Sequence, residues 1–254
     1  RPAEMLGERL AFRGLISQME KVTKSNGRDM LSGPAGCGKE LAERYSHANS
    51  KREDAPFVGV GCASIEPDRM EEVLLGREGD EGTPVPGLLE EANGGFIYLD
   101  EVADMPPGTQ SKMLRVLVDQ TFTRVGGNEK IQVDLRVISS TSRDLEEEIE
   151  SERFRRELYH RLNVVPISVP SLEERREDIP ALADYFIQQL NEEQGLASRD
   201  ISDEAAALLQ TMRWPGNVRQ LRNVIERLLI LGDGNGSIEA RELPGESDAP
   251  VDDG

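Results

Sequence analysis

The spacing of apolar residues changes character near residue 170 of the chain. Before that point, short apolar runs typical of buried strands alternate with stretches in which apolar residues recur at helical spacing. The runs that predict strands are 30–31, 57–60, 96–99, 133–139 and 164–169. The stretches that predict helices are 9–24, 39–48, 68–75, 110–119 and 154–162. After residue 170 only helices are predicted, over 179–194, 203–212 and 217–231.

This order of elements predicts the fold class. Alternating strands and helices followed by helices alone indicate a parallel α/β domain and a small α-helical domain. Residues 76–87 are rich in glycine, proline and acidic residues and predict an exposed loop, while 243–254 has the composition of a linker. We therefore expect an α/β core over 1–170, a helical subdomain over 171–242 and a linker over 243–254.

Composition narrows the class of protein. The 254 residues carry a net charge of -18, which disfavours non-specific binding to DNA and to anionic membranes. No apolar run is long enough to span a bilayer, and two cysteines cannot build a disulfide framework or a zinc site. These features predict a soluble protein of a reducing compartment, most simply the cytoplasm. The chain begins without Met, and we expect it to be part of a longer protein.

A glycine-rich segment after the first predicted strand has the spacing of a P-loop. It reads Gly-Pro-Ala-Gly-Cys-Gly-Lys-Glu over 33–40. Glycines let successive backbone N–H groups converge on phosphate oxygens at a helix N-terminus, and Lys39 would reach the β- and γ-phosphates. Glu40 stands where the general motif has a hydroxyl for Mg²⁺. The alternative is a glycine-rich turn without a ligand.

Two acids close the third predicted strand. Phe-Ile-Tyr-Leu over 96–99 is followed by Asp100 and Glu101, the order of a Walker B segment. Ligands of open parallel sheets bind at the carboxyl ends of strands, where Asp100 would hold Mg²⁺ and Glu101 would orient and polarise the attacking water. The alternative is a strand that ends in two solvated acids.

Arginines supply further candidates. Arg155 and Arg161 lie on a predicted helix and could stabilise a transferring phosphoryl group in a neighbouring subunit, although arginines on a helix usually form a solvated face. Farther on, Pro215-Gly216 predicts a turn, with Asn217 as the N-cap of the next helix. Arg219 would then lie in the first helical turn, where a cation is unfavourable unless an anion binds nearby. The alternative is a simple interhelical turn.

The phrases GPAGCGKE, GGFIYLDEVADMP, FRRELYHRLNVVPISVPSLEERREDIP and WPGNVRQLRN together resemble a known family. They are similar to the central AAA+ ATPase domain of bacterial enhancer-binding response regulators, the NtrC family, and within it to the NtrX branch. The resemblance covers about residues 4–232. It implies an α/β P-loop core with a helical lid, assembled as a hexamer-like ring with ATP between neighbouring subunits.

The resemblance also implies roles for individual positions. The implied nucleotide-binding residues are Gly33, Gly36, Cys37, Gly38, Lys39, Glu40, Leu41 and, on the lid as sensor II, Arg219. Asp100 becomes the residue that holds Mg²⁺, and Glu101 becomes the catalytic acid. Thr141 falls at the sensor I position, and Arg155 and Arg161 match the two arginine fingers.

Three departures from the family stand out. Members that drive sigma-54 polymerase carry a GAFTGA loop, whereas residues 76–87 are shorter and lack its Phe-Thr pair. Gly61 replaces an asparagine that holds the catalytic glutamate in the family, which puts control of hydrolysis in doubt. Asp29 and Ser46 stand where apolar core residues are expected, which predicts lower stability around the P-loop.

We therefore expect a domain that binds and slowly hydrolyses ATP, with Mg²⁺, in a two-component transcriptional regulator. Its partners would be further copies of itself and, in the full-length chain, receiver and helix-turn-helix domains. DNA would be bound only through the latter, RNA polymerase is a candidate partner, and no membrane is involved. Two alternatives remain: a nucleotide-responsive assembly module without turnover, and a small-molecule phosphotransferase that shares the P-loop.

Overall fold

The computed structural model of the protein describes residues 28–39, 54–232 and 236–245. The helix predicted at 9–24, nearly all of the one at 39–48, and residues Glu40, Leu41 and Ser46 lie outside this part. The described residues form two compact units. One contains 28–33 and 54–168, and the other contains 34–39, 169–232 and 236–245.

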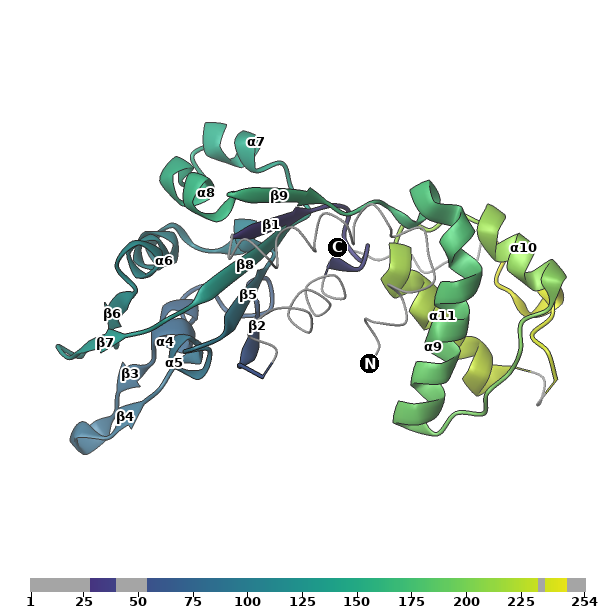
Figure 1. Ribbon diagram of the computed structural model, residues 1–254, viewed down its shortest axis with the longest axis horizontal. Helices are drawn as coiled ribbons and strands as arrows, with labels where there is room; N and C mark the ends of the chain where they lie inside the picture. Colours follow the sequence, from purple (N-terminus) through teal and green to yellow (C-terminus); the bar gives the residue numbers. More distant parts are fainter. Residues whose placement is uncertain (1–27, 40–53, 233–235, 246–254) are drawn as a thin grey trace. The chain divides into compact units, whose positions relative to one another are not determined.

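A parallel five-stranded sheet organises the first unit, with strand order β2-β5-β8-β1-β9 (Figure 1). The strands are β1 (Asp29–Ser32), β2 (Phe57–Gly61), β5 (Phe96–Asp100), β8 (Arg136–Thr141) and β9 (Val165–Ser168). Each lies on one of the predicted apolar runs, which confirms the parallel α/β class. The run at 133–139 was placed about three residues too early, since Val133 precedes the start of β8.

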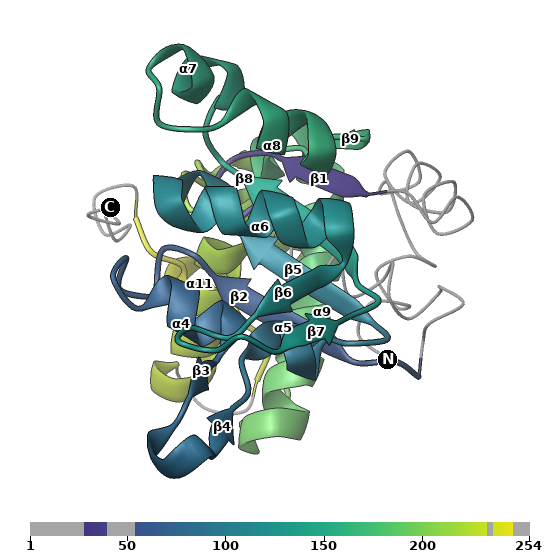
Figure 2. The same cartoon turned by 90° about the vertical axis from the view of Figure 1, so that its left-hand side faces the viewer.

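Helices cover the sheet of this unit. They are α4 (Met70–Leu75), α5 (Leu88–Glu91), α6 (Pro107–Asp119), α7 (Leu145–Glu150) and α8 (Arg156–Leu162). Figure 2 shows α6 crossing in front of the central strands, and it buries Met113, Val116 and Leu117 in the core. The pattern missed α7 because its sequence, LEEEIE, has only two apolar residues. This helix begins at a local signal, since the Asp144 carboxylate accepts hydrogen bonds from the N–H groups of Glu146 and Glu147.

The segment predicted as an exposed loop, 76–87, folds as a small hairpin. It contains β3 (Arg77–Glu78), a 3₁₀ turn η1 (Asp80–Gly82) and β4 (Pro84–Val85). Its tip is exposed, as predicted, but its base is closely packed. Gly76 has φ 77°, and a Cβ there would lie 2.5 Å from the carbonyl oxygen of Val85, so only glycine fits.

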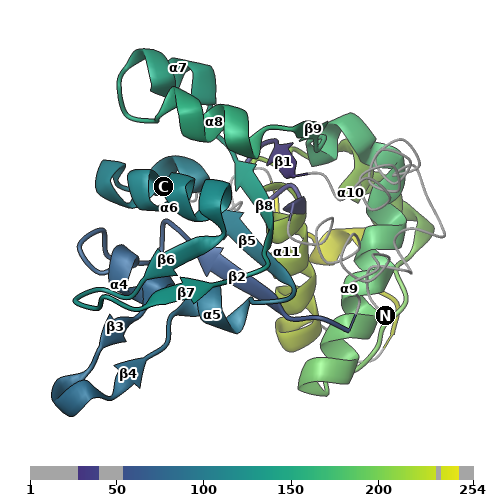
Figure 3. The ribbon, with the colours of Figure 1, turned by 60° about the vertical axis from the view of Figure 1, so that its left-hand side comes forward.

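A second hairpin, unpredicted from the sequence, lies beside the first (Figure 3). It joins β6 (Thr121–Thr123) to β7 (Lys130–Gln132). Arg124, between them, donates two hydrogen bonds of 3.0 and 2.7 Å to the carboxylate of Glu90 on α5 and lies 3.4 Å from Glu78 on β3. One guanidinium therefore connects both hairpins to the helix that precedes β5.

The second unit is helical, as predicted. It contains η3 (Leu172–Asp178), α9 (Ile179–Gln194), α10 (Asp203–Thr211), α11 (Asn217–Leu231) and the short turn η4 (Ala240–Glu242). Trp214 is buried in its core and donates its indole N–H to the carbonyl of Leu209 at 2.8 Å. Leu243, the first residue of the predicted linker, is also buried in this core. Within the described ranges, no helix is long and apolar enough to cross a membrane.

A buried ion pair lies inside the sheet of the first unit. Asp29 on β1 is 1% exposed, and its carboxylate is 3.7 Å from the guanidinium of Arg136 on β8. That guanidinium also lies 5.1 Å from the ring centre of Phe96. Burial raises the pKa of Asp29 to about 6, and Arg136 opposes this rise only in part. The charged carboxylate of Asp29 therefore lowers the free energy of unfolding relative to the protonated form.

This cost predicts a pH dependence of stability. The pKa of Asp29 is raised on folding, so protonation of this residue stabilises the folded state. This stabilisation is complete below about pH 4 and is lost as the pH rises through about 6. Relative to Asp29→Asn, the wild type should lose roughly 2–3 kcal/mol of unfolding free energy between pH 4 and 7.5. Urea unfolding at several pH values measures this difference.

The exposed Asp68 provides a matched control. Asp68→Asn should show a difference from wild type that hardly changes with pH, because the side chain of Asp68 is exposed to water in the folded protein as it is in the unfolded chain. A pH-independent difference for Asp29→Asn as well would contradict the assigned cost.

Candidate functional site

The glycine-rich segment at 33–39 has the backbone of a phosphate-binding loop. Gly36 and Gly38 have φ values of +76° and +97°, which favour glycine. A Cβ on Gly36 would lie 2.5 Å from the carbonyl oxygen of Gly216. The ammonium of Lys39, a residue only 6% exposed, donates to the carbonyl of Pro34 at 3.4 Å. The loop therefore holds a cation over its own backbone, as an anion site requires.

The start of α11 is attached to this loop within the same unit. Asn217 donates its amide to the carbonyl of Ala35 at 3.2 Å and accepts the N–H of Leu172 at 2.8 Å. Asn217 is the first residue of α11, with φ +51°, so the prediction that its side chain caps the helix was wrong. Gly216 is the N-cap. The capping role was lost because the amide is used for tertiary contacts.

Arg219 lies in the first turn of α11, as predicted. Its backbone N–H donates to the carbonyl of Gly36 at 3.1 Å, while its side chain is exposed. An exposed guanidinium at a helix N-terminus adjoining a glycine-rich loop favours binding of an anion there. The lid thus contributes one candidate cation to the loop.

The two acids lie at the carboxyl end of β5 in the first unit. Asp100 accepts the hydroxyl of Ser140, on β8, at 2.7 Å and that of Tyr98 at 3.4 Å. The backbone N–H of Glu101 donates to the same Ser140 hydroxyl at 3.2 Å. Ser140 was not among the predicted site residues, yet it fixes both acids to the neighbouring strand.

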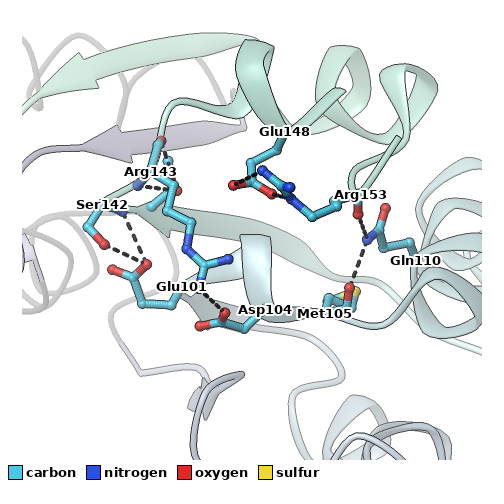
Figure 4. Close-up of polar contacts among 9 residues, drawn as sticks. Glu101, Asp104, Met105, Gln110, Ser142, Arg143, Glu148 and Arg153 are labelled. Carbon is cyan, nitrogen blue, oxygen red and sulfur yellow. Dashed lines mark hydrogen bonds and ion pairs between the residues drawn. The ribbon is translucent and has the colours of Figure 1, made fainter. Parts of the chain in front are cut away.

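Glu101 leaves the strand in a left-handed conformation, with φ +54° and ψ +59°. Its carboxylate accepts the hydroxyl of Ser142 at 2.9 Å and the backbone N–H of Ser142 at 3.2 Å (Figure 4). Beside it, Arg143 pairs with Asp104 at 2.7 Å. The carboxylate of Glu101 is therefore held by the residue that directly follows β8.

Thr141, the predicted sensor I residue, does not make this contact. It is 3% exposed, and its hydroxyl accepts the N–H of Arg143 at 3.1 Å and donates to the carbonyl of the same residue at 3.2 Å. The structure instead brings the neighbouring Ser140 and Ser142 to the acids. The signal in the sequence was the run of four hydroxyl residues over 139–142, in which only one had been singled out.

Gly61, at the end of β2, offers no side chain to Glu101. It pairs with Asp100 in the sheet register, and a Cβ there would lie 3.1 Å from the hydroxyl oxygen of Ser64. The described partners of the Glu101 carboxylate come from the other side, at the end of β8. Gly61 lacks a side chain for Glu101, as the sequence indicates, and the carboxylate of Glu101 is bonded to Ser142.

The acids create a strongly negative field. Burial raises the pKa of the Cys62 thiol to about 12, and the carboxylates of Asp100, Asp104 and Glu101 add to this rise. No three His, Cys, Asp or Glu side chains in the described ranges form a cage for a metal. Mg²⁺ is usually held by one or two carboxylates together with substrate phosphates, so Asp100 in this negative field fits such an ion.

The two candidate arginine fingers differ in environment. Arg155 is exposed at the N-cap of α8, and its backbone N–H donates to the side-chain oxygen of Gln110 at 2.9 Å. Arg161 is partly buried and donates to the carbonyl of Leu117 at 3.3 Å. The structure therefore presents Arg155 to solvent and engages Arg161 with the end of α6.

Two known family models together match nearly the whole chain. A model described as the Sigma-54 interaction domain matches residues 5–168, and one described as the AAA+ ATPase lid domain matches 173–253. The nitrogen assimilation regulatory protein NtrX of Azorhizobium caulinodans is 51% identical over 253 residues, which is 98% of this chain and 56% of that protein. The chain therefore spans about half the length of this relative.

Crystal structures of NtrX from Brucella abortus are similar to the structure of this chain. The first of them is 51% identical in sequence and superposes with a TM-score of 0.87, and the match covers 96% of this chain and 57% of the Brucella chain. Crystal structures of the same Brucella protein in complex with ADP and with ATP match with TM-scores of 0.84. The ATP complex covers 94% of this chain and 56% of its own.

Proposed function

The chain belongs to the family of sigma-54 interaction domains with an AAA+ lid, and from this premise we propose that it binds and hydrolyses ATP in a ring of identical subunits. The observation that carries the proposal is the pair Asp100 and Glu101 at the end of β5, held by the hydroxyls of Ser140 on β8 and of Ser142 directly after it. The ATP and ADP complexes of the Brucella relative support nucleotide binding.

In this proposal, the glycine-rich loop and Arg219 of the lid hold the nucleotide. Backbone N–H groups of the loop, including that of Gly38, surround the phosphates, and Lys39 contributes a charge-assisted hydrogen bond. The N–H groups of Gly33 and Cys37 shape the loop by donating to the carbonyls of Thr141 and Pro34. Arg219 adds a second cation from α11. Glu40 and Leu41, at the start of the following segment, complete the set proposed from the family resemblance.

The acids handle the water that attacks the terminal phosphorus. Asp100 would hold Mg²⁺, which would supply positive charge to neutralise the phosphates. Glu101 orients the water and polarises its O–H bond, which requires its carboxylate to turn from Ser142 toward the water. Ser142 therefore holds Glu101 in a resting position, the task that an asparagine at position 61 would otherwise have.

Neighbouring subunits complete each site in this proposal. Arg155, which is exposed, stabilises charge on the phosphoryl group bound to the next subunit, and Arg161 joins it after leaving the carbonyl of Leu117. Receiver and DNA-binding domains of the full-length regulator would set the assembly state of the ring and its location on DNA.

A second candidate function is a nucleotide-responsive assembly module without turnover. The observation that favours it is Gly61, which leaves β2 without a side chain to control Glu101. Both Lys39 and Glu101 would bind or sense nucleotide in that case, but no phosphate would be released.

The β3–β4 hairpin leads to a proposal about output. Its exposed tip carries Asp80 and Glu81, and Val85, 41% exposed, is its largest exposed apolar side chain. Contact energy at protein interfaces concentrates in large aromatic or aliphatic anchors, and none occurs over 76–87. We infer that this domain does not remodel sigma-54 polymerase and acts at promoters of another sigma class through assembly on DNA.

Two variants separate nucleotide binding from hydrolysis. Lys39→Ala should weaken ATP binding by roughly 1.5–3 kcal/mol, because a charge-assisted contact to phosphate is lost. Glu101→Gln should retain ATP affinity while turnover falls by about two orders of magnitude or more. Calorimetry and phosphate release measure the two effects. ATP affinity unchanged in Lys39→Ala would exclude its phosphate contact, and absence of turnover in the wild type would favour the assembly module.

Complex formation with sigma-54 tests the inference about the hairpin. In a pull-down with ADP–aluminium fluoride, the wild type should retain no sigma-54, because the acidic tip offers no apolar anchor. A variant with GAFTGA grafted into residues 79–85 provides the comparison and should retain it. A stable nucleotide-dependent complex with the wild type would overturn the inference.

A further inference from the structure

The amide of Gln110 joins two segments that are far apart in the sequence. Gln110 lies near the start of α6 and is fully buried. Its amide nitrogen donates to the carbonyls of Met105 at 2.7 Å and Arg153 at 3.0 Å (Figure 4). Its oxygen accepts the backbone N–H of Arg155 at 2.9 Å. Both amide protons and the oxygen are therefore used on main-chain groups.

One of the joined segments continues directly from Glu101. The turn η2 (Val102–Asp104) follows it, with the N–H of Asp104 donating to the carbonyl of Glu101 at 3.0 Å. Met105 closes this turn through a hydrogen bond of 3.1 Å to Val102. The carbonyl of Met105 that Gln110 contacts is thus four residues from the proposed catalytic acid.

The other segment carries Arg155. The carbonyl of Glu148 accepts the N–H groups of Arg153 at 2.9 Å and Phe154 at 3.2 Å, and the Glu148 carboxylate pairs with the Arg153 guanidinium at 2.7 Å. Phe154 is buried in the core. Glu148 therefore holds this segment from α7, while Gln110 holds the same segment from α6.

We propose that Gln110 is a positioning residue for Arg155, the arginine that a subunit offers to its neighbour. Gln110 fixes the backbone of Arg155 to the segment that follows Glu101 of the same subunit. The proposal rests on the proposed function, in which Arg155 acts across the subunit boundary. The side chain of Arg155 is exposed, but its backbone N–H is held by the buried side-chain amide of Gln110. Without that amide, three main-chain groups lose their partner, and the segment must rearrange.

Gln110→Met tests the proposal because methionine has a similar length and no amide. Its turnover should fall about 10²-fold, the cost of misplacing a catalytic group by about 1 Å, while ATP affinity remains unchanged. A purely structural role would also lower turnover, so the deciding measurement is made on rings mixed from two inactive variants. Phosphate release is recorded at equal amounts of the two subunits and at constant total protein.

The identity of the rescuing partner decides the role of Gln110. Mixed with Glu101→Gln, Gln110→Met should regain turnover several-fold, since its own Glu101 is intact and the neighbour supplies a well-placed Arg155. Mixed with Arg155→Ala, it should regain nothing, because neither subunit offers a positioned arginine. The opposite pattern would show that Gln110 acts inside its own subunit's site and would overturn the proposal, as would wild-type turnover of Gln110→Met or failure of both mixtures.

Mixing Arg155→Ala with Glu101→Gln is the control that separates this proposal from its premise. Turnover should rise in that mixture if sites are shared. Absence of any rise would overturn the shared sites of the proposed function, and the proposal for Gln110 with them. Gln110→Leu, which also lacks the amide, takes the place of Gln110→Met in the same mixtures if the methionine variant does not fold.

Discussion

The hydrogen-bond register between β5 and β8 is the constraint on which the arrangement of the two acids depends. Leu99 is paired with Ser139, so the residues that follow, Asp100 and Ser140, come side by side at the carboxyl edge of the sheet. A slip of one residue would turn these side chains to opposite faces. The contact between Glu101 and Ser142 and the turn that leads to Gln110 both continue from this edge. The chemistry proposed here therefore depends on the pairing of two buried strands.

The glycine-rich loop, in the other unit, depends on backbone conformations that few residues adopt. Gly36 and Gly38 take positive φ, and the close approach of Gly36 to Gly216 leaves no room for a side chain. Asn217 then attaches the loop to the segment that starts at Leu172. A loop held in this way keeps its conformation without a ligand, so in the proposed function no binding energy is spent on ordering it.

Much of this could be predicted from the sequence, and the omissions share a physical cause. Buried parallel strands and long amphipathic helices have strong apolar patterns, and α9, α10 and α11 lie close to the predicted ranges. The missed α7 and the two small hairpins are set by polar contacts such as the Asp144 cap and the Arg124 ion pairs, which hydrophobic spacing does not report. The P-loop and the acids could be proposed from the sequence because their chemistry requires a fixed spacing. The contacts of Ser142 and Gln110 could not, because they form only when distant segments meet.

In the proposed function, each catalytic site is completed by a second chain. The decisive test is the rate of phosphate release per subunit, measured over a wide range of protein concentration at saturating ATP. This rate should rise with concentration and reach a plateau when assembly is complete. A rate per subunit that stays constant from dilute to concentrated protein, with no change in oligomeric state, would contradict it.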